Sequence, residues 1–190
     1  IIGTQLYSML CEADLNVFNL EAPLTDNDTS IDKFGHNLKS PTKTINGFKA
    51  IPSLLLGLAN NHSYDQGYEG LQSTMQVLTQ SNIAYSGAGG NVNEAKQPYI
   101  FTKDGIRLGI YMCTENEFSS ASVHRAGANP FDILESFDHV QTLKEQCDYV
   151  IVIYHGGKEF YRYPSPMLQR YCRKFIEKGA SLVLCQHSHC

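Results

Sequence analysis

Short apolar runs alternate along this 190-residue chain with longer stretches that carry apolar residues at helical spacing. A run of about 4–8 apolar residues bounded by polar residues or glycine is typical of a buried strand. Such runs predict strands at residues 16–20, 53–58, 83–86, 99–102, 107–113, 149–154 and 181–185. The run at 149–154 has no charged or amide member, so we expect a central strand covered on both faces.

Several stretches between these runs repeat apolar residues three and four positions apart, which predicts amphipathic helices. They lie at residues 5–12, 44–50, 67–81, 132–146 and 164–178. Pro166 fits the first turn of the last helix, and Gly179 fits its C-terminal end. Asp104-Gly105 between two apolar runs predicts a hairpin. Repeated alternation of strands and helices around one hairpin predicts an α/β fold with a mixed sheet.

Composition and charge exclude several classes of protein. Hydrophobic residues make up 42% and charged residues 18%, which is ordinary for a globular domain. The formal net charge of −4 argues against a basic surface built for nucleic acid. None of the apolar runs approaches the ~18 residues that a membrane helix needs. We therefore expect no nucleic-acid partner and no membrane segment within this chain.

The ends of the chain and its cysteines bear on location. The sequence starts without Met and stops directly after His-Ser-His, so we expect truncation at both ends, and an upstream signal or anchor stays open. The six cysteines have no CxxC pair and no disulfide-like spacing, which favours free thiols over a disulfide framework. Free thiols favour the cytoplasm, while a surface or membrane-anchored location stays open.

Polar residues follow four of the predicted strands at the point where each strand ends. They are Glu21, Asn61 with His62, His155, and His187 with His189. Considered one at a time, each of these residues could equally belong to an ordinary polar turn or be a metal ligand. Together they matter more, because polar residues just past strand ends are the usual positions for chemistry in α/β sheets. Carboxylate, amide and imidazole groups suit divalent ions such as Mn, Zn and Fe.

The two histidines after the last predicted strand are separated by one residue. In an extended segment, side chains two positions apart point the same way. We therefore expect His187 and His189 to reach one metal centre or two adjacent ones. A two-ion site activates water and stabilises both oxygens of an in-line displacement at phosphorus, so the pattern favours metal-assisted hydrolysis.

Four strings of residues carry a resemblance to a known family. They are Asn-Leu-Glu at 19–21, Asn-Asn-His-Ser-Tyr-Asp-Gln-Gly at 60–67, Tyr-His-Gly-Gly-Lys-Glu at 154–159 and His-Ser-His at 187–189. Together they resemble the capsule-synthesis CapA family, also described as poly-gamma-glutamate biosynthesis proteins, in the calcineurin-like metallophosphoesterase superfamily. The resemblance implies an αββα sandwich with mixed sheets. It also implies that residues 1–190 form one such domain, without its first metal motif and its C-terminal part.

The resemblance also implies a set of metal ligands. Glu21 takes the place of the bridging Asp of the superfamily, and Asn61 and His155, joined by His187, look like ligands of one metal. His189 looks like a ligand of the other metal. The cofactors implied are divalent ions, either Mn, Zn or Fe. A complete chain would hold two, and this chain at most one, because the remaining ligands of the second position lie upstream.

His62 lies where the superfamily keeps the catalytic histidine that contacts a phosphate oxygen or protonates the leaving group. Two departures accompany it: Glu21 stands where Asp is usual, and Ser63 follows the histidine where an acidic residue is usual. We therefore expect Asp65 to orient His62 in place of that acidic residue. Glu159 is expected to accept a hydrogen bond from the one ring nitrogen of a neighbouring histidine that does not bind the metal.

Lys158 and Arg162 follow His155 closely. They are expected to contact an anionic polymer or a phosphate, with a solvated surface as the alternative. Two functions stay open. One is metal-dependent hydrolysis of a phosphoester or a polymer bond, and the other is a non-catalytic component of polymer synthesis or export that binds an anionic polymer and carries a vestigial metal site.

Overall fold

Two β-sheets packed face to face organise the molecule. The computed structural model describes residues 3–115 and 117–190. The helices are α1 (Thr4–Glu12), α2 (Ile45–Phe48), α3 (Gly67–Gln80), α4 (Val92–Ala95), α5 (Ser136–Gln146) and α6 (Pro166–Glu177). The strands are β1 (Asn16–Asn19), β2 (Leu54–Gly57), β3 (Ala84–Ser86), β4 (Ala88–Gly89), β5 (Tyr99–Lys103), β6 (Ile106–Thr114), β7 (Gly127–Ala128), β8 (Tyr149–His155) and β9 (Leu182–Gln186). Every predicted helix and strand is present with its ends within a turn of the prediction.

The two large sheets differ in strand direction. The first has the order β1-β2-β3 with all strands parallel. The second has the order β5-β6-β8-β9, in which β5 and β6 form the predicted antiparallel hairpin and the other pairs are parallel. The expectation of mixed sheets is therefore correct for the second sheet and wrong for the first. β8 lies between β6 and β9, as its apolar composition predicted.

Side-chain alternation along the strands builds the layers. Leu55 of β2 faces Ile110 and Met112 of β6 between the sheets, whereas its neighbours Leu54 and Leu56 face the opposite way, toward α3. This follows from the two-residue period of a strand. Because each sheet buries one face against the other, both outer faces need helices.

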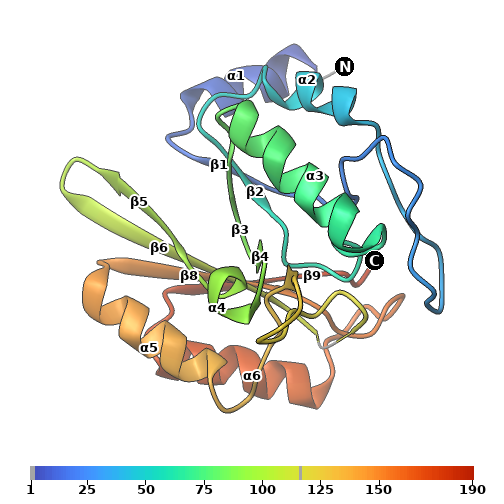
Figure 1. Ribbon diagram of the computed structural model, residues 1–190. Helices are drawn as coiled ribbons and strands as arrows, with labels where there is room; N and C mark the ends of the chain where they lie inside the picture. The colour runs from blue at the N-terminus through green and yellow to red at the C-terminus, as the bar shows by residue number, and fades with distance from the viewer. Residues whose placement is uncertain (1–2, 116) are drawn as a thin grey trace.

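The outer layers are α3 on one side and α5 with α6 on the other, as Figure 1 shows. Leu71 and Leu78 of α3 are buried in the core of the first sheet. Val140 of α5 and Phe175 of α6 are buried in the core of the second sheet. The order helix, sheet, sheet, helix is the αββα sandwich that the resemblance implied.

Two small features were missed from the sequence. No strand was predicted over residues 87–90, but β4 pairs there antiparallel with β7. α4 follows directly and begins at Asn91, whose side chain accepts hydrogen bonds from the backbone N–H groups of Asn93 and Glu94. Elements of two to four residues are too short to show a period, so the pattern of apolar residues could not reveal them.

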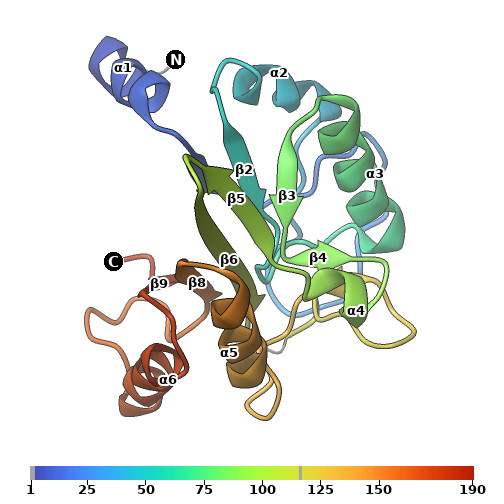
Figure 2. The ribbon, with the colours of Figure 1, turned by 90° about the vertical axis from the view of Figure 1, so that its left-hand side faces the viewer.

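α1 differs from the other long helices because it buries none of its residues. Figure 2 shows it standing away from the two sheets. Across residues 3–115 and 117–190, no helix combines the length and apolar character that a membrane crossing requires.

The parallel strands bring the candidate residues to one edge. In the second sheet, Thr114 of β6, His155 of β8 and Gln186 of β9 lie side by side in register. In the first sheet, Asn19 of β1 pairs with Gly57 of β2 at the corresponding ends. Segments that follow these strands therefore meet at the carboxyl edge of the sandwich, where α/β sheets place their chemistry.

Candidate metal centre

Amide side chains hold the carboxylate of Glu21 in place. Asn19 Nδ2 donates to Glu21 Oε2 at 2.7 Å, and Asn60 Nδ2 donates to Asn19 Oδ1 at 3.0 Å. Asn60 is fully buried and also donates to the carbonyl oxygen of Leu20 at 2.9 Å. Sequence reasoning missed Asn19 and Asn60, although both lie in the strings that carry the family resemblance. Their position close to the predicted ligands Glu21 and Asn61 was the available signal.

Four predicted ligands come together at the end of β8. His155 Nε2 lies 3.1 Å from Asn61 Oδ1 and 3.6 Å from Glu21 Oε1. The ring centroids of His155 and His187 are 5.0 Å apart. Glu21, His155 and His187 each offer a ligand atom within 4.8 Å of the other two. Residues separated by more than 160 positions thus form one cluster of oxygen and nitrogen donors.

The protonation and hydrogen bonding of this cluster fit a divalent ion. Burial, followed by the nearby His187, lowers the pKa of His155 to about 4. The imidazole is therefore neutral at physiological pH, which is the form that binds metals. Within the described residues, Nδ1 of His155 and Nδ1 of His187 are buried without a hydrogen-bond partner. A buried polar atom without a partner is unfavourable by about 1–3 kcal/mol. A metal ion bound at such a nitrogen would serve as its missing partner and remove this cost.

His189 belongs to a second group of donors. Glu159, His187 and His189 also offer ligand atoms within 4.8 Å of one another, and Glu159 Oε1 lies 3.3 Å from His187 Nε2. The resemblance assigned His189 to a position shared with Glu21, but in the structure it is grouped with Glu159. Glu159 was expected to support a neighbouring imidazole, and its carboxylate lies beside that of His187; the same carboxylate also lies within reach of the second group of candidate donors. His187 is common to both groups.

The backbone of the last segment is not extended, contrary to the prediction. β9 ends at Gln186, and φ is 95° at His187 and 52° at His189. Both values lie in the left-handed region, which is uncommon for residues other than glycine. Phe160 N–H donates to the carbonyl oxygen of Ser188 at 2.7 Å and holds the segment against the loop after β8. The imidazoles meet because of this turn, with ring centroids 5.7 Å apart.

His62 lies in the turn after β2, outside both groups of donors. Its Nδ1 is 2.6 Å from Asp65 Oδ2, so the expected partner carboxylate is beside it. Lys33 pairs with the other oxygen of Asp65, and its Nζ lies 3.4 Å from His62 Nδ1. The side chains of Lys33 and Asp65 are only 4% and 1% exposed. Sequence reasoning missed Lys33, because it lies in a polar stretch without a motif.

Hydrogen bonds hold the polar stretch that contains Lys33 against the turn that contains His62. Leu38 N–H donates to Asp65 Oδ2 at 2.6 Å, and Ile31 N–H donates to the carbonyl oxygen of Asp65 at 3.0 Å. The buried side chain of Gln66 accepts from Thr29 N–H at 3.0 Å. These bonds position an otherwise irregular loop, which is how a lysine far from His62 in sequence reaches its imidazole.

Breaking the buried pair between Lys33 and Asp65 should destabilise the fold. Lys33→Met is expected to lower the free energy of unfolding by about 3–5 kcal/mol, because it leaves a buried carboxylate without its cation. Lys39→Met in the same loop is the matched control: its partner Asp28 is exposed, so we expect a loss below about 1 kcal/mol. Urea unfolding of the metal-free protein measures both. Equal losses would show that the pair makes no special contribution.

Glu115, which follows β6, shapes the loop after His155. Its Oε1 accepts from Gly157 N–H at 2.9 Å. A Cβ at Gly156 would come within 2.3 Å of Glu115 Cγ, and Gly157 has φ 110°. Both glycines are therefore required for the turn. Sequence reasoning missed Glu115, although it too is a carboxylate just past a strand.

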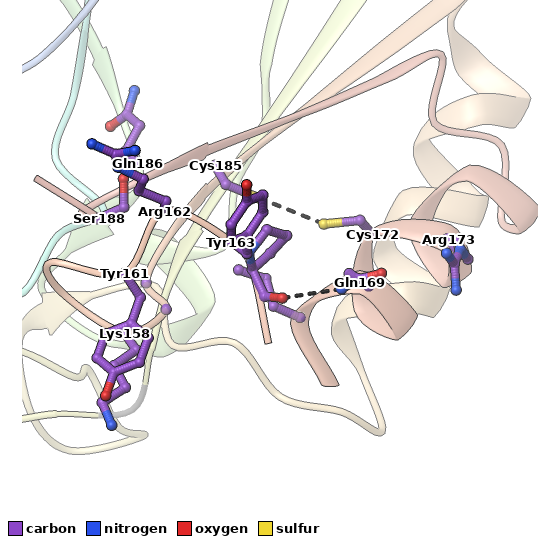
Figure 3. A pocket seen from close by; sticks show the side chains of 14 residues that line it. Lys158, Tyr161, Arg162, Tyr163, Gln169, Cys172, Arg173, Cys185, Gln186 and Ser188 are labelled. Carbon is purple, nitrogen blue, oxygen red and sulfur yellow. Dashed lines mark hydrogen bonds between the residues drawn. The ribbon is translucent and has the colours of Figure 1, made fainter. Parts of the chain in front are cut away.

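The loop after His155 borders a cavity of about 400 Å³ between that loop, β9 and α6. Lys158, Arg162 and Arg173 line it, and Figure 3 shows their side chains around the opening. Lys158 Nζ lies 4.3 Å from the ring centroid of Tyr161. Gln186 and Ser188, which flank His187, also line this cavity. The two predicted substrate-binding residues thus lie on one cationic cavity beside the imidazole cluster.

Comparison with known proteins places this architecture in a family. The family model described as "Bacterial capsule synthesis protein PGA_cap" matches residues 2–190. The chain belongs to this family. The capsule-synthesis resemblance based on the strand-end strings is thereby confirmed.

Two relatives in this family have names that refer to capsule or polymer synthesis. The chain is 26% identical over 159 residues to "Capsule biosynthesis protein CapA" of Bacillus anthracis, covering 80% of this chain and 39% of that protein. It is 26% identical over 176 residues to "PGA biosynthesis protein CapA" of Bacillus subtilis (strain 168), covering 90% of this chain and 46% of that protein. The chain thus spans less than half the length of these relatives.

Among solved structures, a Haemophilus influenzae NAD nucleotidase aligns with a TM-score of 0.46 and 19% identity. The alignment covers 78% of this chain and 26% of that one.

Proposed function

We propose that this capsule-synthesis domain is a metal-dependent hydrolase that cleaves a phosphoester or a bond in an anionic polymer during capsule or poly-gamma-glutamate biosynthesis. The observation that carries the proposal is the cluster of Glu21, Asn61, His155 and His187, with His62 nearby in the turn after β2. The names of the relatives supply the polymer context.

Each residue of the cluster has a defined part in this proposal. Glu21, Asn61, His155 and His187 hold one divalent ion, either Mn, Zn or Fe. When bound, such an ion activates water and stabilises negative charge on a substrate oxygen. Asn19 keeps the Glu21 carboxylate oriented. His189 serves a second ion position in the complete protein, and this chain alone holds at most one ion tightly.

His62 acts on substrate in this proposal. Asp65 holds Nδ1 of the imidazole, which leaves Nε2 to contact a phosphate oxygen or to give a proton to the leaving group. Lys33 balances the charge of Asp65. The side chain of His62 is 19% exposed, so a substrate can reach it.

Metal removal tests the proposal. The complete protein would be assayed with bis(p-nitrophenyl) phosphate and with poly-gamma-glutamate, before and after treatment with a chelator. We expect hydrolysis of one of them to stop on chelation and to return with Mn or Zn. Hydrolysis that persists in metal-free protein would refute metal dependence.

The cationic cavity favours a second candidate, a non-catalytic component that binds an anionic polymer. Lys158, Arg162 and Arg173 around one opening form a surface that attracts carboxylates. Polymer binding without turnover, equal in metal-loaded and metal-free protein, would favour this function over hydrolysis.

A hydrolase that cleaves a polymer bond and a component that only binds the polymer both predict that the cavity binds an anionic polymer. Lys158→Ala and Arg162→Ala should each weaken binding of poly-gamma-glutamate roughly 2–5-fold at low salt, the range of an exposed charge pair. The loss should shrink near 0.5 M salt, because exposed charges are screened. Lys174→Ala is the control, since this lysine lies on α6 outside the cavity and pairs with Glu177. Titrations followed by fluorescence anisotropy measure the affinities, and unchanged affinity in both cavity variants would leave Lys158 and Arg162 as solvated surface residues.

A further inference from the structure

Two cysteines from different elements face each other at the wall of the cavity. Cys172 lies on α6 and Cys185 on β9, and their Sγ atoms are 3.5 Å apart. A dashed line in Figure 3 marks the contact between Cys172 on the helix and Cys185 on the strand. The distance corresponds to van der Waals contact, so the sulfurs need to approach by only about 1.5 Å to reach the length of a disulfide bond.

The elements that carry these thiols are well anchored. α6 begins at Ser165, whose Oγ accepts from Leu168 N–H at 3.1 Å, and Phe175 is fully buried beneath it. Cys185 pairs in register with Tyr154 of the central strand β8. The thiols therefore meet because of the packing of helix on sheet.

A small oxidant can reach the pair. Both cysteines line the cavity, and Arg162 and Arg173 line it with them. An anionic disulfide such as oxidised glutathione is attracted by these charges.

We propose that Cys172 and Cys185 form a reversible disulfide that joins α6 to β9 at the wall of the cavity. The oxidant is a small disulfide. The thiolate of one cysteine attacks one of its sulfurs, so that a mixed disulfide forms and one thiolate leaves. The other cysteine then attacks the sulfur of the first, and the second thiolate leaves. Two cysteine thiols are oxidised, the small disulfide is reduced to two thiols, and the two cysteine protons pass to the leaving thiolates.

The disulfide would connect the cavity to the metal-ligand segment. Cys185 is followed by Gln186 and His187, so fixing its side chain to α6 restrains the end of β9. This inference does not depend on the proposed hydrolase activity. It assigns a modification site to two residues that the sequence predicted to be unlinked thiols.

Peptide mapping of the oxidised protein tests this inference. The protein would be treated with oxidised glutathione in the presence of a chelator, alkylated, digested without reduction and analysed by mass spectrometry. We expect a Cys172–Cys185 cross-link as the main product. Exposed Cys11 is the internal control, where only a glutathione adduct is expected. The cross-link should raise the melting temperature by roughly 5–10 °C, and dithiothreitol should reverse the rise.

Single variants separate the two steps. Cys185→Ser and Cys172→Ser should each accumulate a stable glutathione adduct at the remaining cysteine, because the thiol that would close the cross-link is missing. The inference is overturned if the unaltered protein shows Cys11 modified while Cys172 and Cys185 stay free. It is also overturned if each carries its own adduct without a cross-link, or if Cys185 links to Cys190 instead.

Discussion

His155→Ala is expected to abolish tight binding of a divalent ion by this chain, whereas His189→Ala is expected to spare it. His155 is buried at the centre of the cluster and lies 3.1 Å from Asn61 Oδ1. Four oxygen and nitrogen donors suffice to hold a divalent ion, and His155 is the donor that lies against both Asn61 and Glu21, so its loss removes the centre of the group. His189 belongs to the second, more exposed group.

Elemental analysis after loading with Mn or Zn and dialysis measures this difference. We expect about one ion per chain in the unaltered protein and in His189→Ala, and close to none in His155→Ala. His139→Ala is a matched control, because His139 lies on α5 and contacts Tyr111 outside the cluster. Equal metal loss in the two site variants, or two tightly held ions per chain, would show that this division of ligands is wrong.

The second large effect is expected at His62. In the complete protein, His62→Ala should retain its metal and lose turnover by roughly 10²–10⁴-fold, the usual range for a general acid or base. The reason is geometric: Nδ1 of His62 is engaged by Asp65, and the imidazole is a member of neither group of metal donors.

Parallel measurement of turnover and metal content decides the role of His62. His36→Ala is the control, since His36 lies in the neighbouring loop without a place in the proposed site. Loss of metal together with activity would make His62 a ligand. If the unaltered protein hydrolyses its substrate and His62→Ala does so at the same rate, His62 has no part in the mechanism.

The periodicity of the sequence was sufficient for the longer strands and helices and for the α/β fold class. Strands with apolar residues on both faces, such as β2 and β8, must be covered on both sides, so an α/β sandwich follows from pattern alone. The strand-end positions of Glu21, His155 and His187 were equally visible. Parallel strands bring such positions to one edge regardless of the details of packing.

Contacts between distant segments could not be predicted in this way. Lys33 reaches His62 because backbone N–H groups of an irregular loop donate hydrogen bonds to the side chains of Asp65 and Gln66. No local sequence pattern predicts these contacts. The grouping of His189 with Glu159 depends on left-handed backbone conformations that the sequence of two histidines does not suggest.

The sequence by itself thus determined the alternation of elements, the family and the residues at the ends of the strands, because these depend on local period and order along the chain. Only the tertiary structure showed which candidate donors lie together, that Lys33 and Asp65 form a buried pair, and that Cys172 meets Cys185. The physical reason is that side-chain neighbours across a helix–sheet or loop–turn contact are set by packing geometry. Spacing in the sequence carries no information on that geometry.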